Sequence, residues 1–142
     1  MTLRLFALLA AVLLLAALPA RAEGHYPLTV TDSFGREVTI PAEPKAILLG
    51  TGLDLVALSL IHPDPVSLLA GWAGDMKGDT SGIYARFKEK FPAIEDVPVI
   101  GDGITVSYEA LLSLNADLAI LANWQADTDT GKQAIAFLEQ AG

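Results

Sequence analysis

The chain has 142 residues, with 17 acidic side chains against 9 basic ones, a formal net charge of −8 and no cysteine. This balance argues against nucleic acid or an anionic membrane as a partner, because both are held first through lysine and arginine. The lack of cysteine excludes a disulfide and a lipid-acceptor thiol.

The first 22 residues have the pattern of a secretory signal peptide. Arg4 precedes an apolar run from Leu5 to Ala20, and Ala20-Arg21-Ala22 places two small residues at a cleavage-type site. A basic start, an apolar core and such a site are typical of an export signal, so we predict cleavage after Ala22. A membrane anchor is the alternative, but the run is shorter than the roughly 20 apolar residues of a spanning helix.

The segment that remains after cleavage, residues 23–142, is long enough for one domain with its own core. Cleavage removes Arg4 and Arg21, which leaves 7 basic residues against 17 acidic ones and a charge of −10. We therefore expect a soluble, monomeric protein of the periplasm or the extracellular space.

Two short β-rich stretches open this segment and predict a hairpin over residues 28–40, with its turn at Asp32-Ser33-Phe34-Gly35. Apolar stretches that follow the hairpin predict buried strands at 46–49, 66–70, 97–100 and 118–122. Segments with helical spacing or capping signals lie between and after them, at 53–61, 83–91, 108–114 and 130–140. This alternation predicts an α/β fold of three layers, with a mainly parallel sheet, flanking helices and a preceding β-hairpin.

Ligands of such sheets bind at the carboxyl ends of the strands. Two tryptophans, Trp72 and Trp124, directly follow predicted strands and are candidates for contact with a ligand. Burial of either indole in the core is the alternative. Gly50-Thr51-Gly52 also follows a strand, and it indicates a tight strand-to-helix turn because it lacks the Lys-Ser/Thr of a phosphate-binding loop.

Lys77, Tyr84 and Arg86 follow the longest of these loops, where a cation and a phenol could meet an anionic ligand. A solvated helix face is the alternative for Arg86. Catalytic signatures do not occur: the sequence lacks a cysteine nucleophile and a Gly-x-Ser-x-Gly elbow, so we expect no enzyme activity. His25 and His62 do not make a metal site by themselves, and we expect neither a resident metal nor a cofactor.

Three parts of the sequence carry a resemblance to a known family. They are the stretch LTVTDSFGREVTIP from Leu28 to Pro41, a strand that ends in Gly50, and VSYEALLSLNADLAILA from Val106 to Ala122. Together they resemble the amino-terminal lobe of the periplasmic substrate-binding proteins for iron-siderophore and vitamin B12 uptake. The hairpin and the stretch around Glu109 are its most diagnostic parts.

The resemblance implies a protein of two α/β lobes that binds a ferric siderophore between the lobes and delivers it to an ABC permease of the inner membrane. Glu109 resembles the carboxylate that docks on the permease, and Trp124 resembles a cleft residue that lies against the ligand. Asn115-Ala116 departs from the usual Lys-Pro. Since the sequence given ends at Gly142, we expect the joining helix and the second lobe to be absent from it.

Other functions stay open at this stage. Vitamin B12 or haem would suit the same family. A truncated module that only contacts a permease or receptor is a second possibility, and a small secreted α/β enzyme is a third.

Overall fold

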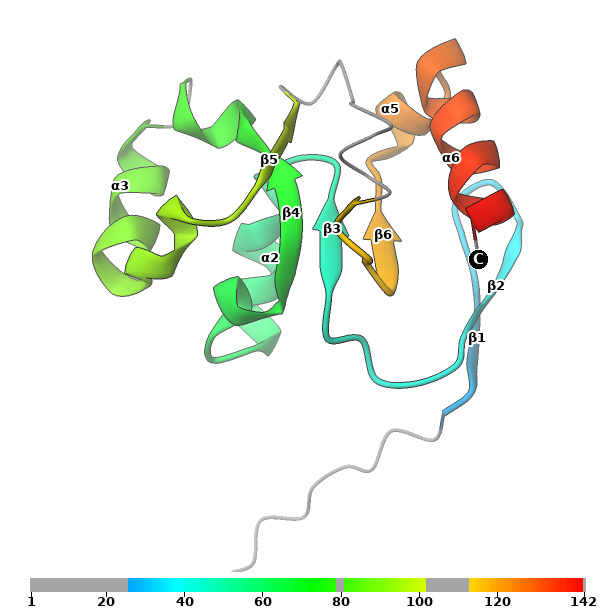
Figure 1. Ribbon diagram of the computed structural model, residues 1–142, viewed down its shortest axis with the longest axis horizontal. Helices are drawn as coiled ribbons and strands as arrows, with labels where there is room; N and C mark the ends of the chain where they lie inside the picture. Colours follow the sequence, from blue (N-terminus) through cyan, green and yellow to red (C-terminus); the bar gives the residue numbers. More distant parts are fainter. Residues whose placement is uncertain (1–25, 79–80, 102–112, 142) are drawn as a thin grey trace, which may run out of the picture.

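The structure is a computed structural model that describes residues 26–78, 81–101 and 113–141. It is a mixed α/β fold, which confirms the predicted fold class (Figure 1). Its strands are β1 (Leu28–Thr31), β2 (Glu37–Ile40), β3 (Ile47–Leu49), β4 (Leu69–Ala73), β5 (Val99–Gly101) and β6 (Leu118–Ile120). Its α-helices are α2 (Asp54–Ile61), α3 (Ser81–Lys90), α5 (Asn123–Ala126) and α6 (Asp129–Ala141), and its 3-10 turns are η1 (Pro65–Leu68), η2 (Gly74–Lys77) and η3 (Pro92–Glu95).

The predicted hairpin is present as the antiparallel pair β1–β2, in which Leu28 lies opposite Ile40. Its turn contains Gly35 at φ +78°, a left-handed conformation that glycine adopts without a steric penalty. The amide of Gly35 donates to the carbonyl of Asp32 at 3.0 Å. Glycine at this point therefore closes the turn and sets the hairpin register.

The four remaining strands form one sheet in the order β5-β4-β3-β6, and every neighbouring pair is parallel. Consecutive strands of such a sheet need crossover connections, which α2 and α3 help to supply. The sheet stands in the middle of Figure 1, with α3 on one side and α6 and the hairpin on the other. All four strands thus end at the same edge of the sheet.

Alternation along β3 divides the core between the two faces of the sheet. Ile47 and Leu49 belong to the larger cluster, to which α2 contributes the fully buried Leu55. Leu48 points to the opposite face, where Leu138 of α6 packs against it. This is the period-two geometry of a strand that is covered on both faces.

The structure corrects the expected strand at 66–70. Residues 65–68 form the 3-10 turn η1, which begins with a proline and in which Asp64 accepts a hydrogen bond from the amide of Ser67 at 3.3 Å. The strand β4 begins only at Leu69 and runs through Trp72 to Ala73. Trp72 is therefore a residue of the strand rather than of the loop after it.

Two further predictions concern the second half of the chain. Asn123-Trp124-Gln125, for which no helix is predicted, belongs to the short helix α5, and α6 matches the helix predicted at 130–140 within one residue at each end. The helix predicted at 108–114 lies almost entirely outside the described residues. In the part of the chain that is described, no helix has the length and apolar character needed to cross a membrane.

Helix α2 is apolar on both sides. Leu55 is buried, whereas Leu53, Val56, Leu60 and Ile61 are exposed, with Leu60 at 83%. These four exposed residues recur at helical spacing and lie on one face. A helix at a protein surface normally carries polar side chains on that face, so α2 presents an apolar stripe on the described surface.

We predict opposite stability effects for the same substitution at two helical glycines. A Cβ at Gly131 in α6 would overlap the backbone carbonyl of Gln125, so Gly131→Ala should lower the free energy of unfolding by about 1–3 kcal/mol. A Cβ at Gly82 in α3 would meet no atom within 4 Å, so Gly82→Ala should raise it by about 0.5–1 kcal/mol through helix propensity. Urea denaturation of both variants measures the difference, and a neutral Gly131→Ala would contradict the packing of α5 on α6.

Candidate functional site

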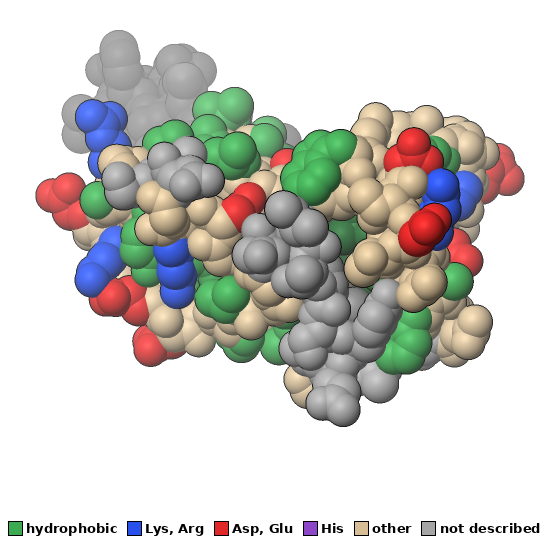
Figure 2. Space-filling view, turned by 90° about the horizontal axis from the view of Figure 1, so that it is seen from above, with side chains coloured by type: hydrophobic (Ala, Val, Ile, Leu, Met, Phe, Trp, Pro, Cys, Tyr) green, Lys and Arg blue, Asp and Glu red, His purple; other side chains and the backbone are tan. Residues whose placement is uncertain are grey.

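The carboxyl edge of the parallel sheet carries three described connections. β3 leads into the turn at Gly50–Gly52, β4 leads into η2, and β6 leads into α5. Because ligands of parallel sheets bind at this edge, it is the candidate site. Figure 2 looks down on the edge and shows hydrophobic side chains near its middle, with most charged side chains toward the two ends of the molecule.

Asp75 of η2 joins the turn after β4 to the turn after β3. Its carboxylate accepts hydrogen bonds from the Thr51 hydroxyl at 2.6 Å and from the Gly52 amide at 2.7 Å. Thr51 is buried, at 7% exposure. Charge-assisted bonds of this length are the stronger kind, so the two turns are held as one unit.

Gln125 of α5 makes the corresponding connection from β6 to β3. Its side-chain Nε2 donates to the carbonyl oxygen of Gly50 at 2.6 Å, and its Oε1 accepts from the amide of Ala122 at 3.0 Å. The residue is 7% exposed. A buried amide with a partner for both its donor and its acceptor side fixes the place of α5 on the sheet.

The predicted tight turn at Gly50-Thr51-Gly52 is confirmed, and these contacts explain its two glycines. A Cβ on Gly50 would lie 2.7 Å from Oε1 of Gln125, and one on Gly52 would lie 2.8 Å from Oδ1 of Asp75. Both distances are too short for real atoms. The glycines therefore allow the two polar side chains to approach the backbone.

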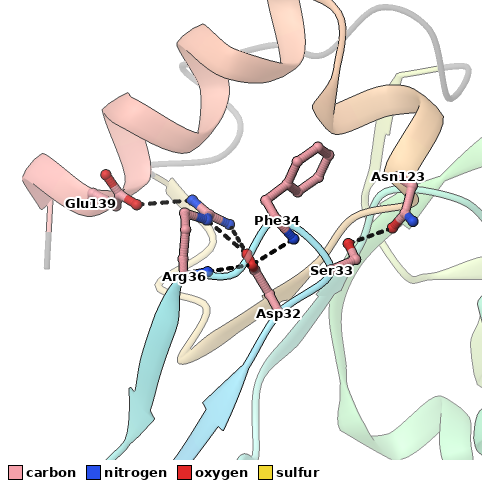
Figure 3. A network of polar contacts seen from close by, with 6 residues as sticks. All are labelled: Asp32, Ser33, Phe34, Arg36, Asn123 and Glu139. Carbon is pink, nitrogen blue, oxygen red and sulfur yellow. Dashed lines mark hydrogen bonds and ion pairs between the residues drawn. The ribbon is translucent and has the colours of Figure 1, made fainter.

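The tip of the β1–β2 hairpin contacts helices α5 and α6 (Figure 3). Ser33 donates its hydroxyl hydrogen to Oδ1 of Asn123 at 2.7 Å, and Arg36 pairs with Glu139 of α6 at 2.9 Å. The carboxylate of Asp32 accepts from the Arg36 guanidinium at 2.6 Å and from the amide of Phe34 at 2.9 Å. The diagnostic hairpin stretch thus ties β1–β2 to α5 and α6.

These contacts also act on the charge of Asp32. The hydrogen bond from the Arg36 amide is the main reason that the pKa of the Asp32 carboxyl lies below its usual value, and the Arg36 side chain and the Phe34 amide add to it. Asp32 is therefore ionised in the folded hairpin, and it stays available to accept all of these bonds.

The expectation that Trp72 contacts a ligand is contradicted by its burial, because the residue is 0% exposed. It belongs to the larger core cluster, together with Met76 and Ile94. Its indole stacks on the ring of Tyr84 in α3, with centroids 6.0 Å apart. The physical reason is its place inside β4, on the face of the sheet that this cluster covers.

Lys77 and Tyr84 lie together, as their positions along the sequence suggested. The Nζ atom of Lys77 lies 5.6 Å from the centroids of both Trp72 and Tyr84, a distance at which a cation is attracted to an aromatic face. Lys77 is exposed and Tyr84 is half-buried. Arg86 is exposed on α3, and its role in ligand binding stays a prediction.

Trp124 differs from Trp72 in every respect that matters for binding. It lies on α5 at the carboxyl edge, and 57% of its side chain is exposed. An indole is costly to leave in water and offers a large flat surface for packing. Trp124 is therefore the main apolar candidate for contact with a ligand at this edge. Glu109, the predicted docking residue, lies outside the described residues.

The sequence does not reveal the roles of two polar residues of this edge. Asp75 and Gln125 look like ordinary polar residues of the segments that follow predicted strands. Their partners lie 24 and 75 residues away along the chain, so no local signal reveals them. Within the described residues, no group of three or more His, Cys, Asp or Glu side chains is placed to hold a metal ion.

We predict that Asp54→Asn stabilises the protein at pH 7. Partial burial at the start of α2 raises the pKa of the Asp54 carboxyl, and the negative charge of Asp75 raises it further. The native state then binds this proton more tightly than the unfolded chain does, so stability falls as pH rises from about 3.8 through the folded pKa.

Thermal unfolding at several pH values tests this prediction. Asp54→Asn should raise the midpoint at pH 7 and give no gain below about pH 3, where both states are protonated. Asp96→Asn, a change at an exposed carboxylate after η3, is the matched control. An equal effect of Asp54→Asn at both pH values would show that charge is not the cause.

Comparison with known proteins supports the fold. No family model and no curated protein matches this sequence. Among solved structures, the chain is similar to the crystal structure of the TroA-like periplasmic binding protein FepB from Veillonella parvula, with a TM-score of 0.63 and 23% sequence identity. The match covers 78% of this chain and 34% of the other one. The chain thus has the α/β fold of part of that protein and spans about a third of its length.

Proposed function

We propose that this chain is the amino-terminal lobe of a periplasmic substrate-binding protein, exported after loss of residues 1–22, that serves an ABC importer. The observation that carries the proposal is an exposed indole, Trp124, at the carboxyl edge of a four-stranded parallel sheet that shares its fold with a periplasmic binding protein. A ligand site at this edge follows the general rule for parallel sheets.

The ligand that we propose is a ferric siderophore, held between this lobe and a second one. Such a chelate offers flat apolar surface and anionic groups. Trp124 supplies an aromatic face, and the exposed Lys77 supplies a positive charge at the same edge of the sheet. The bonds of Asp75 and Gln125 support this role, because a site that is rigid before binding loses less entropy when the ligand arrives.

Calorimetric titration of the protein isolated from the periplasm tests this function. The panel comprises ferric siderophores of different chelate classes, haem and cobalamin. We expect saturable binding of one siderophore class and a loss of about tenfold or more in Trp124→Ala, since truncated aromatic anchors typically cost 1–3 kcal/mol or more. Tyr26→Ala, which removes an exposed aromatic ring before β1, is the matched control and should leave affinity unchanged.

Each alternative outcome has a clear meaning. Binding of cobalamin or haem alone would keep the protein class and change the ligand. Binding of none of the panel by the protein or by any longer product of its reading frame would favour a module that only contacts a permease. Turnover of any compound would favour an enzyme.

We also propose that Glu109 docks on the permease. Glu109 resembles the docking carboxylate of the family, and a charge that meets a basic partner acts on association with that partner rather than on the ligand. Glu109→Ala should therefore reduce uptake by cells while leaving the affinity of the purified protein for its ligand unchanged. Equal loss of affinity and uptake would place Glu109 in the ligand site instead.

A further inference from the structure

We propose that Gln125 is a positioning residue for ligand binding: it fixes the direction in which the neighbouring Trp124 presents its indole. This inference rests on the proposed function, because it assigns to Gln125 the preparation of the surface that the ligand meets. Gln125 itself is buried, so we assign it no direct contact with the ligand.

The Gln125 side chain bonds to two backbone groups that need opposite partners. Its amide donates to the carbonyl of Gly50 and accepts from the amide of Ala122 at the same time. A glutamate would be acceptor-only when ionised, and its carboxylate would face the Gly50 carbonyl oxygen. A methionine of similar length would leave the buried Gly50 carbonyl and the part-buried Ala122 amide without this partner. Only an amide of this length satisfies both.

Helix α5 depends on such contacts for its shape. It has four residues, far fewer than a helix needs to be stable alone. Gln125 holds it from the sheet side, and the bond from Ser33 to Asn123 holds it from the hairpin side. Behind it, Gly131 of α6 packs directly on the carbonyl of Gln125. Trp124 lies between the two polar contacts along the chain.

The two contacts that hold α5 differ in burial. The bond from Ser33 is exposed, whereas that from Gln125 to Gly50 is buried. Exposed hydrogen bonds exchange readily with water, but loss of a buried one leaves its partner unsatisfied. The Gln125 bond is therefore the stronger determinant of where α5, and with it the indole, lies relative to the β3 turn.

The chain contains two tryptophans, so 19F NMR of the full chain labelled with 5-fluorotryptophan gives one resonance for each. Trp124→Phe assigns the two resonances, and the buried Trp72 serves as an internal reference in every sample. Gln125→Met is the main variant. We expect the Trp124 resonance to move toward the position of a freely exposed indole and to sharpen, while the Trp72 resonance keeps its place.

A second variant and a control keep the test independent of folding. Gln125→Glu keeps the acceptor for Ala122, loses the donor to Gly50 and adds a negative charge beside the Gly50 carbonyl, so it should shift the Trp124 resonance in the same direction. Gln133→Met, at an exposed glutamine of α6, should change neither resonance. Both Gln125 variants should weaken binding of the ferric siderophore about tenfold, as expected when a buried backbone group loses its partner and the indole its fixed direction.

The outcomes separate this inference from the proposed function. Mobile Trp124 together with weakened binding supports both. An unchanged Trp124 resonance in folded Gln125→Met or Gln125→Glu overturns the positioning role, and so does a mobile Trp124 with full affinity. If the wild-type protein binds nothing in the panel while the variants release Trp124, the positioning of the indole by Gln125 stands and the proposed function falls.

Discussion

Trp72→Ala should lower the free energy of unfolding by about 3–5 kcal/mol, the largest effect expected in this chain. The indole is fully buried and packs with Leu49, Met76 and Ile94 in the main core cluster. Its removal takes a large apolar side chain out of the core and leaves a cavity that the sheet cannot fill by relaxing. Ring contacts with Tyr84 and Lys77 would be lost as well.

Trp124→Ala is the matched control, because it removes the same side chain from an exposed position. It should change the free energy of unfolding by no more than about 0.5 kcal/mol, the usual range for surface substitutions. Urea denaturation followed by far-ultraviolet circular dichroism measures both variants without relying on tryptophan fluorescence. Similar losses in the two variants would contradict the division of the tryptophans between core and surface.

Asp75→Ala should lower the free energy of unfolding by about 2–3 kcal/mol. The carboxylate accepts from the buried Thr51 hydroxyl and from the Gly52 amide, and neither donor has an obvious replacement once the side chain is gone. Ligand affinity should fall too, since the turn after β3 forms part of the candidate site. Loss of Asp75 would also relieve the repulsion that raises the pKa of Asp54.

Asp96→Ala, at an exposed carboxylate after η3, is the control for loss of one negative charge. It should leave both stability and affinity close to those of the wild type. A double variant of Asp75→Ala with Thr51→Val shows whether the two residues act together. Its loss of unfolding free energy should be smaller than the sum of the losses in the two single variants. Full additivity would mean that the hydrogen bond between them contributes nothing.

The apolar runs predicted the architecture because buried parallel strands need side chains that are apolar on both faces. The run around Ile47 and Leu48 lies in the central strand, and the run beginning at Leu118 lies at its side. The predicted strand start at Val66 is wrong for a local reason. Asp64 and Pro65 favour a 3-10 turn, and the strand starts only when that turn ends.

The different start and end of β4 explains why Trp72 is buried whereas Trp124 is exposed. Both follow an apolar run in the sequence, so the pattern treats Trp72 and Trp124 alike. A strand that extends a few residues further takes Trp72 into the sheet, and alternation then directs its side chain into the core. Trp124 follows β6, which ends at Ile120, two residues before the predicted end at 122, and it lies on a short helix outside the sheet.

The polar contacts of the site lay beyond prediction for a different reason. Asp75 and Gln125 each bond to the turn after β3, from different positions along the chain. A carboxylate or an amide in a polar loop has many equivalent local uses, such as capping and turn formation. Only the order of the strands shows that these two side chains meet the same turn.

The proposal that the carboxyl edge of this sheet binds a ferric siderophore through Trp124 is tested most directly by the two fluorotryptophan resonances of the full chain under saturation with that ligand. A gallium complex, which lacks the paramagnetism of iron, avoids broadening of the signals. If the ligand contacts Trp124, we expect the Trp124 resonance to shift and the Trp72 resonance to keep its chemical shift. A ligand that binds tightly yet leaves the Trp124 resonance unmoved would contradict the proposal.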